Sequence, residues 1–216
     1  MLSAIKTNIL QMKIIKFLPF FVLILFYNCN PNSSKISKEQ YIEQTQKKEF
    51  EKSDELYENA GKVIGEIQFN LKATEEQKKD WEDGIIPWIS LENTSSQINQ
   101  LINADEIVIK EKLVNIIIDY PLNKPTNFEI ESKNGFSRKN LILAISKKYH
   151  EIYAEEEKTA KTKTTPIDKR TGIINRNETD GKYGIWGHDL GDLDLSGIEI
   201  HQGNDGKINL ILWIES

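Results

Sequence analysis

The pattern of apolar and polar positions predicts one long helix with a single buried face. In NGFSRKNLILAISKKYHEIYAEEEKT, large apolar residues recur at three- and four-residue spacing from Leu141 to Tyr153, the period of an amphipathic helix. Ser137 precedes this run and suits the N-cap, so we predict a helix over about 137–157. The acids at 155–157 lie where the helix dipole favours cations. We therefore expect the last turn to fray or to pair with lysine.

Five other segments have the composition and spacing of β-strands. KLVNIIIDYP is rich in β-branched residues and stops at Pro121, and TNFEIES alternates apolar with polar residues. LSGIEIHQ and KINLILWIE flank GNDG, which is typical of a hairpin turn. KVIGEIQFNLK also alternates and favours a strand over about 62–72, although a helix would suit the same residues. Together these segments predict an α+β fold, with a small antiparallel sheet packed against one long amphipathic helix.

Three weaker helical patterns come before the middle of the chain. Charged residues at helical spacing with a narrow apolar stripe predict a helix within about 37–59, which forms an N-terminal helical segment. We interpret it as a partly solvated connection to the domain. Thr74, followed by acids, predicts the N-cap of a helix that ends at Gly84. A further helix is expected over about 95–103, with its apolar residues on one face.

The N-terminal segment has the organisation of an export signal. In MKIIKFLPFFVLILFYNC, a basic region is followed by an apolar run from Phe17 to Tyr27 and then by Cys29. The apolar run has 11 residues, whereas a membrane-spanning helix needs about 20. We interpret it as the core of a signal peptide. Either Met1 or Met12 fits as the start, because MKIIKF is already a complete basic region.

The residues around Cys29 resemble the signal of a bacterial lipoprotein, in which this cysteine is lipidated and becomes the mature N-terminus. Tyr27 and Asn28 stand where the usual pattern has a small residue, and the bulky aromatic run is similar to lipoproteins of Bacteroidota-type bacteria. The resemblance implies a signal peptide at 1–28 and a protein anchored in the cell envelope, facing the periplasm or the cell surface. A secretory signal with an incidental cysteine and an uncleaved anchor stay open as alternatives. Cys29 is the chain's one cysteine, which suits an oxidising compartment.

The rest of the chain divides into a tether with a charged helix, at 29–60, and a single α+β domain, at 61–216. Within the domain, residues 159–181 are rich in Thr, Lys and Asn, and a stretch of this length without regular pattern predicts a flexible loop. Its lone apolar pair, Ile173 and Ile174, is expected to dock part of the loop.

The net charge argues against nucleic acid as a partner. The chain has a formal charge of −5, and the first 28 residues contain three Lys and no acid, so the mature part carries −5 − 3 = −8. Binding to a phosphate backbone needs a basic face. Only three Arg are present, and no basic cluster compensates for the acids.

The candidate site lies in YGIWGHDLGDLDLSGIEI, which holds Trp186, His188, Asp189 and Asp192 between glycines just ahead of a strand. Histidine and carboxylates are the side chains that metal sites use. The calcium-loop pattern that opens at Asp192 fails, because Gly203 stands at the twelfth position, which requires a bidentate Glu. The alternative is that these polar residues form a turn leading into the strand, with its leucines buried and its aspartates in solvent.

The aromatic residues offer a second interpretation. Exposed indoles beside carboxylates would suit a glycan or peptide ligand. For Trp186 and Trp81 this interpretation and burial in the core are equally open, whereas we expect Trp88 and Trp213 to fill the core. The orientation of His201 is also open. No G-x-S-x-G elbow and no phosphate-binding Gly-rich loop occurs, so we predict no cofactor and no resident metal.

The segments NGFSRKNLILAISKKYHEIYAEEE and NRNETDGKYGIWGHDLGDLDLSGIEI together resemble an uncharacterised group of bacterial proteins. The resemblance covers about residues 119–216 and implies that this part is the core module of the domain. It implies no activity. We expect a lipid-anchored, non-enzymatic binding or interaction module with a protein or glycan partner in the envelope. A metal-dependent or hydrolytic enzyme centred on His188 and Asp189, or an immunity-type protein, are the alternatives.

Overall fold

The computed structural model describes residues 37–51, 59–171 and 176–216, which belong to one compact unit. The signal peptide, Cys29 and the pair Ile173 and Ile174 lie outside the described residues. No helix in the described part is long and apolar enough to cross a membrane. The helices are α1 (Lys38–Glu51), α3 (Thr94–Gln97) and α4 (Arg138–Thr159). The strands are β1 (Lys62–Gln68), β2 (Leu71–Lys72), β3 (Ile85–Ile86), β4 (Ile89–Ser90), β5 (Ile107–Ile109), β6 (Leu113–Ile118), β7 (Thr126–Glu131), β8 (Phe136–Ser137), β9 (Asp194–Gln202) and β10 (Ile208–Glu215).

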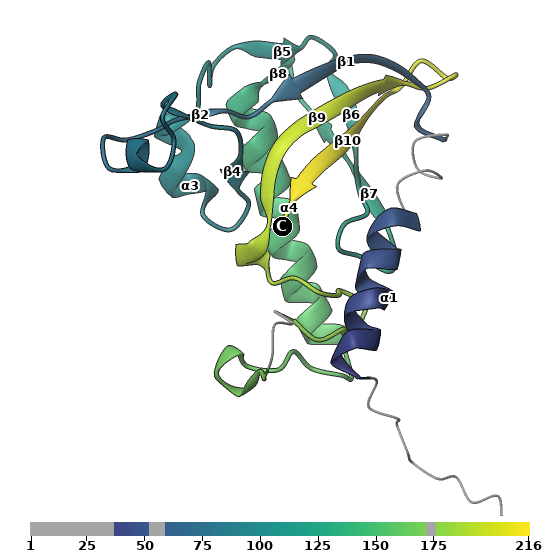
Figure 1. Cartoon of the computed structure of the whole chain (residues 1–216). Coiled ribbons are helices and arrows are strands. Elements are labelled where there is room, and N and C mark those ends of the chain that lie inside the picture. Colours follow the sequence, from purple (N-terminus) through teal and green to yellow (C-terminus); the bar gives the residue numbers. More distant parts are fainter. Residues whose placement is uncertain (1–36, 52–58, 172–175) are drawn as a thin grey trace, which may run out of the picture. The chain divides into compact units, whose positions relative to one another are not determined.

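The main sheet has the order β1-β9-β10-β6-β7, and β4 pairs with the first residues of β9 (Figure 1). The predicted hairpin of β9 and β10 is confirmed, and β6 pairs with β7 in antiparallel direction. The prediction of an antiparallel sheet is wrong at one pair of strands, because β10 pairs with β6 in parallel. The two strands lie far apart in the sequence, and α4 intervenes between them. The direction of such a pair depends on how the chain crosses the sheet, which strand patterns do not record.

Helix α4 is the predicted long helix and covers one face of the sheet (Figure 1). The Ser137 hydroxyl caps its first turn by accepting the N–H of Asn140 at 3.2 Å. Five of the side chains predicted for its apolar face are buried, namely Leu141, Ile142, Ile145, Tyr149 and Ile152. The sixth, Tyr153, is partly buried. The predicted helix and its buried face are therefore confirmed.

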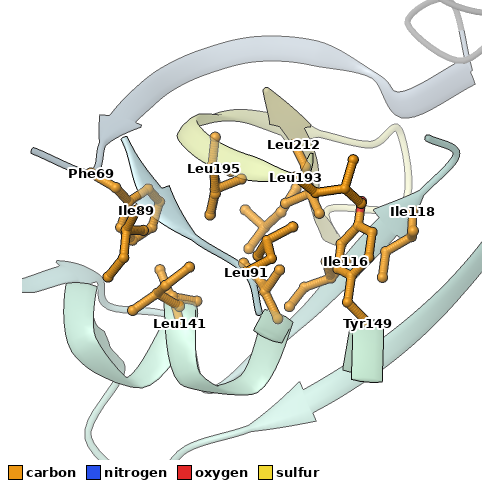
Figure 2. Close-up of a cluster of buried hydrophobic side chains, with 14 of the residues drawn as sticks. Phe69, Ile89, Leu91, Ile116, Ile118, Leu141, Tyr149, Leu193, Leu195 and Leu212 are labelled. Carbon is orange, nitrogen blue, oxygen red and sulfur yellow. The ribbon is translucent and has the colours of Figure 1, made fainter. Parts of the chain in front are cut away.

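The core lies between α4 and the sheet (Figure 2). From the second half of the chain it takes Leu193 and Leu195 and the α4 residues Leu141 and Tyr149, all of them fully buried. Its other part comes from residues before 119, which include Phe69, Leu71, Ile89, Leu91, Ile116 and Ile118, each with at most 1% of its surface exposed. Both halves of the domain thus supply the same core.

Two of the shorter predicted helices are reduced in the structure. Thr74 makes the predicted cap, since its hydroxyl accepts the N–H of Gln77 at 3.3 Å, but only a single 3-10 turn follows at Gln77–Lys79. The flanking residues pair as β2 and β3, and this pairing leaves the segment as a loop between two short strands. The helix predicted over 95–103 is the short α3 followed by a 3-10 turn at Ile98–Gln100. The prediction of a full helix over 74–84 was therefore wrong.

Candidate functional site

Trp186, the first of the sequence-predicted site residues, is part of the core. Its side chain is 1% exposed, and its ring meets that of Tyr120 edge-on, with 5.2 Å between the centroids. The backbone N–H of Trp186 donates to the carbonyl of Pro121 at 3.2 Å, which ties the segment to the turn after β6. A buried indole cannot stack on a ligand at the surface, so the interpretation of Trp186 as an exposed binding residue is wrong.

His188 lies at the edge of the same aromatic group. Its ring centroid is 5.5 Å from that of Tyr120 and 6.0 Å from that of Trp186. Its carbonyl accepts a hydrogen bond of 3.0 Å from the Tyr153 hydroxyl of α4. Burial raises the pKa of Tyr153, so the hydroxyl keeps its proton and acts as a donor. These contacts position the backbone of His188 on the helix.

The Asp189 carboxylate is bound by two arginine side chains. Arg170 donates to both carboxylate oxygens, and Arg176 donates from Nη1 to Oδ1 at 3.1 Å. Both guanidinium groups are largely shielded from solvent, with 12% and 6% of the side chains exposed. Two adjacent cations oppose the approach of a metal ion, so the geometry speaks against a metal centre on Asp189.

Asp192 forms a turn with Asp189. Its Oδ2 accepts the N–H of Asp189 at 2.8 Å, and its own N–H donates to the carbonyl of Asp189 at 3.0 Å. Leu193 and Leu195 are fully buried, while Asp192 and Asp194 are partly exposed. The interpretation as a turn that leads into a strand with buried leucines is therefore confirmed.

No three His, Cys, Asp or Glu side chains lie close enough to hold a metal ion within residues 37–51, 59–171 and 176–216. Asp194 follows this turn and stands opposite Glu215 on β10. Burial, and then the neighbouring negative charge of Glu215, raise the pKa of Asp194. This shift follows mainly from burial and does not by itself define a site.

Glu156 on α4 accepts four hydrogen bonds and was not a predicted site residue. It is fully buried and accepts the hydroxyl of Thr179 and the N–H of Gly181 at 2.7 Å each. It also accepts the N–H of Tyr183 at 2.7 Å and that of Gly184 at 3.1 Å. Burial alone would raise the pKa of Glu156, but these hydrogen bonds outweigh it and lower the pKa.

The end of α4 is ordered by these contacts. The helix continues to Thr159, and Glu155 pairs with Lys182 at 2.9 Å. Glu156 holds residues 179–184, which include the end of the 159–181 loop. The hydrogen bonds from Lys182, and then from Tyr183, lower the pKa of Glu155. The expected pairing with lysine is thus confirmed, and the alternative of a frayed last turn is wrong, because a second acid finds backbone donors.

The loop predicted at 159–181 is hydrogen-bonded to itself in its described part. Asp180 Oδ1 accepts the N–H groups of Lys161 at 2.9 Å and of Thr162 at 2.7 Å. The N–H of Thr165 donates to Asn177 at 2.7 Å. Together with the arginines on Asp189, these bonds join the two ends of the loop.

The other aromatic and histidine residues have structural positions. Trp81 and Trp88 meet edge-on, with 5.0 Å between the ring centroids, and both pack against the core. Trp213 is partly buried and lies over Gly197, where a side chain would collide with its ring. The expectation that Trp213 fills the core is wrong, because its neighbours Leu210 and Leu212 on β10 are the residues that face the core. His201 is 2% exposed, with its Nδ1 3.0 Å from the Gly61 carbonyl and its Nε2 3.2 Å from Glu199.

A hollow lies on the face of the sheet that α4 does not cover. Ile116 and Leu210 point to the core, so the alternating neighbours Asn115 and Asn209 point to the opposite face. The hollow has a volume of about 470 Å³ and is lined by Asn115, Asn127, Phe128, Glu129, Asp205, Lys207 and Asn209. A second hollow of about 250 Å³ shares four of these residues and adds Leu113 on β6.

Three asparagines cross the floor of this hollow, which we call the amide hollow. Asn127 Nδ2 donates to Asn115 Oδ1 at 3.1 Å, and Asn115 Nδ2 donates to Asn209 Oδ1 at 3.0 Å. Asn209 Nδ2 donates in turn to the carbonyl of Ala60 at 2.8 Å. We did not predict this set, although the sequence carries a signal, since KLVNIIID and KINLILW each place one Asn within an apolar strand.

The comparisons with known proteins give this chain no relative. No family model matches the sequence, and neither the curated proteins nor the solved structures contain a match. The function is therefore inferred from the sequence and the structure of this chain.

Proposed function

We propose that this protein is a lipid-anchored component of the bacterial cell envelope and a non-enzymatic binding module, whose binding site is the amide hollow. One contrast supports the site. The polar groups of Asp189 and Asp192 are used in contacts within the domain, whereas each asparagine of the hollow keeps donor or acceptor capacity. The volume of about 470 Å³ also falls within the range of roughly 300–1,000 Å³ that small-ligand sites occupy.

The anchor is supported by the sequence, in which a short apolar run ends at Cys29. The test is expression of the full chain in a bacterium, with fractionation and mass spectrometry of the N-terminal peptide. We expect membrane association that resists high salt, and an acylated Cys29 as the first residue. Cys29→Ser is expected to abolish the acyl mass. Retention of the whole leader in the wild type would indicate an uncleaved anchor, and soluble wild type would indicate a secreted protein.

Binding at the hollow is tested in the living cell with a photo-crosslinking amino acid in place of Leu113, which is 40% exposed and lines the adjoining hollow. The matched control carries the same amino acid at the exposed Gln46 of α1. We expect a light-dependent adduct at position 113 and none at position 46. Absence of an adduct at position 113 overturns the proposed site. Turnover of an envelope substrate that His188→Ala abolishes would overturn the non-enzymatic assignment.

A further inference from the structure

From the amide hollow we infer the chemical class of its ligand, which is a neutral saccharide unit of an envelope glycan. The inference rests on the proposed function, because it assumes that the hollow is a binding site. Three observations carry it: the fixed direction of the asparagine bonds, the charge balance of the rim, and the exposed apolar wall at Leu113.

The direction of the asparagine bonds is set at one end of the row. The Ala60 carbonyl can only accept, so Asn209 must present its Nδ2 to it and its Oδ1 to Asn115. The same logic makes Asn115 present Oδ1 to Asn127. Each amide therefore has one N–H in use and keeps a second, while its oxygen retains acceptor capacity. A saccharide hydroxyl both donates and accepts, so it matches a floor that offers both.

The charges at the rim disfavour ionic ligands. Lys207 Nζ lies 4.0 Å from Glu129 and 3.9 Å from Asp205, so the cation stands between the two acids. These three side chains sum to −1, which opposes an anion, and the amine of Lys207 offsets most of the attraction that the two acids would exert on a cation. The acidity of the mature chain, −8 without its first 28 residues, adds to the repulsion of anions. A neutral polar ligand is the class that remains.

Leu113 supplies the apolar part of the site. It is 40% exposed at the start of β6 and lines the smaller hollow with Asn115 and Glu129. A sugar ring presents C–H groups on its faces and hydroxyls around its edge. An apolar wall beside amide groups is complementary to both parts.

The test is calorimetric titration of the soluble domain, residues 30–216, with neutral oligosaccharides of the gluco-, xylo-, manno- and N-acetylglucosamine series, and with a sulfated oligosaccharide. We expect saturable binding of at least one neutral series and none of the sulfated probe. Asn115→Ala is expected to weaken binding at least tenfold. Asn127→Ala, at an exposed position, is expected to weaken it without loss of folding, and Gln46→Ala is expected to leave it unchanged.

The outcomes separate the ligand class from the proposed function. No binding of any neutral series, or binding that the asparagine substitutions leave intact, overturns the saccharide inference. If no neutral series binds but the partner crosslinked at position 113 is degraded by protease, that partner is a protein. The hollow is then a binding site for a protein, and the proposed function stands. If position 113 gives no adduct at all, the proposed function falls with it.

Discussion

The buried carboxylate of Glu156 joins the end of α4 to residues 179–184. Three acids at the end of α4 conflict with the helix dipole when the helix is considered alone. In the folded domain Glu156 meets three backbone N–H groups and a hydroxyl from residues 179–184, and this arrangement compensates its charge. Gly181 is required beside it, because a Cβ there would lie 2.7 Å from the carboxyl group. These hydrogen-bond partners lie 23–28 residues after Glu156, so the spacing of neighbouring residues in the sequence does not predict them.

Glu156→Gln is expected to lower the free energy of unfolding at neutral pH by about 2 kcal/mol, because bonds to a charged acceptor become bonds to a neutral one. The folded-state pKa of Glu156 is lowered, so the carboxylate stabilises the fold above its unfolded-state pKa. This stability is lost as the pH falls through the folded-state pKa, and the difference between wild type and variant should shrink there. Urea unfolding across pH measures it.

The control for this prediction is Glu151→Gln in the same helix, where the acid is half-exposed and pairs with Lys148 at 3.4 Å. A surface pair of this kind contributes about 0.5 kcal/mol. Equal losses in the two variants would contradict the role assigned to Glu156.

At the scale of elements, three side chains spaced i, i+4 and i+7 along α1 hold this helix against residues 176–187. They are Tyr41, Thr45 and Lys48. The hydroxyl of Tyr41 donates to the Arg176 carbonyl at 2.9 Å and accepts the N–H of Gly187 at 3.2 Å. Thr45 approaches Gly187, and Lys48 pairs with Glu178 at 2.9 Å. The sequence indicated a partly solvated connecting helix with a narrow apolar stripe. Among its described side chains, the contacts are made by a mainly polar stripe instead.

Tyr41→Phe is expected to weaken the attachment of α1 by about 1 kcal/mol, since two backbone groups lose their partner. Hydrogen exchange with mass spectrometry should show about fivefold faster exchange in α1, while the amides of β10 keep their wild-type rates. Gln44→Ala, at an exposed position of the same helix, should leave both unchanged. Unchanged exchange of α1 in Tyr41→Phe would show that other contacts hold the helix.

At the scale of the whole molecule, residues 59–118 and 119–216 build one core. β1 pairs with β9 from Lys62 to Gln68, and β4 pairs with the start of β9. The resemblance over 119–216 implied a core module in that half of the chain. Removing the first half would uncover the buried side chains of β9 and leave β10 without β6.

A fragment of residues 119–216 is therefore expected not to fold by itself, whereas residues 59–216 should unfold in one cooperative transition. Circular dichroism during thermal unfolding and the dispersion of amide signals in NMR measure both. A cooperative transition of the 119–216 fragment would contradict the shared core and support an independent module.

The sequence by itself determined the features that depend on neighbouring residues. The period of α4, its Ser137 cap, the β9–β10 hairpin and the turn at Asp189 and Asp192 each follow from spacing within a few positions. The sequence also supports the prediction of an anchor at Cys29.

Only the tertiary structure decided which side chains meet across long separations. It placed Trp186 in the core, two arginines on Asp189, backbone donors on Glu156, and β6 parallel to β10. Asn115 and Asn209 were each visible as a polar residue in an apolar strand, but they are 94 residues apart. Their hydrogen bond requires the parallel pairing that puts both on one face, and residue spacing carries no information about that pairing.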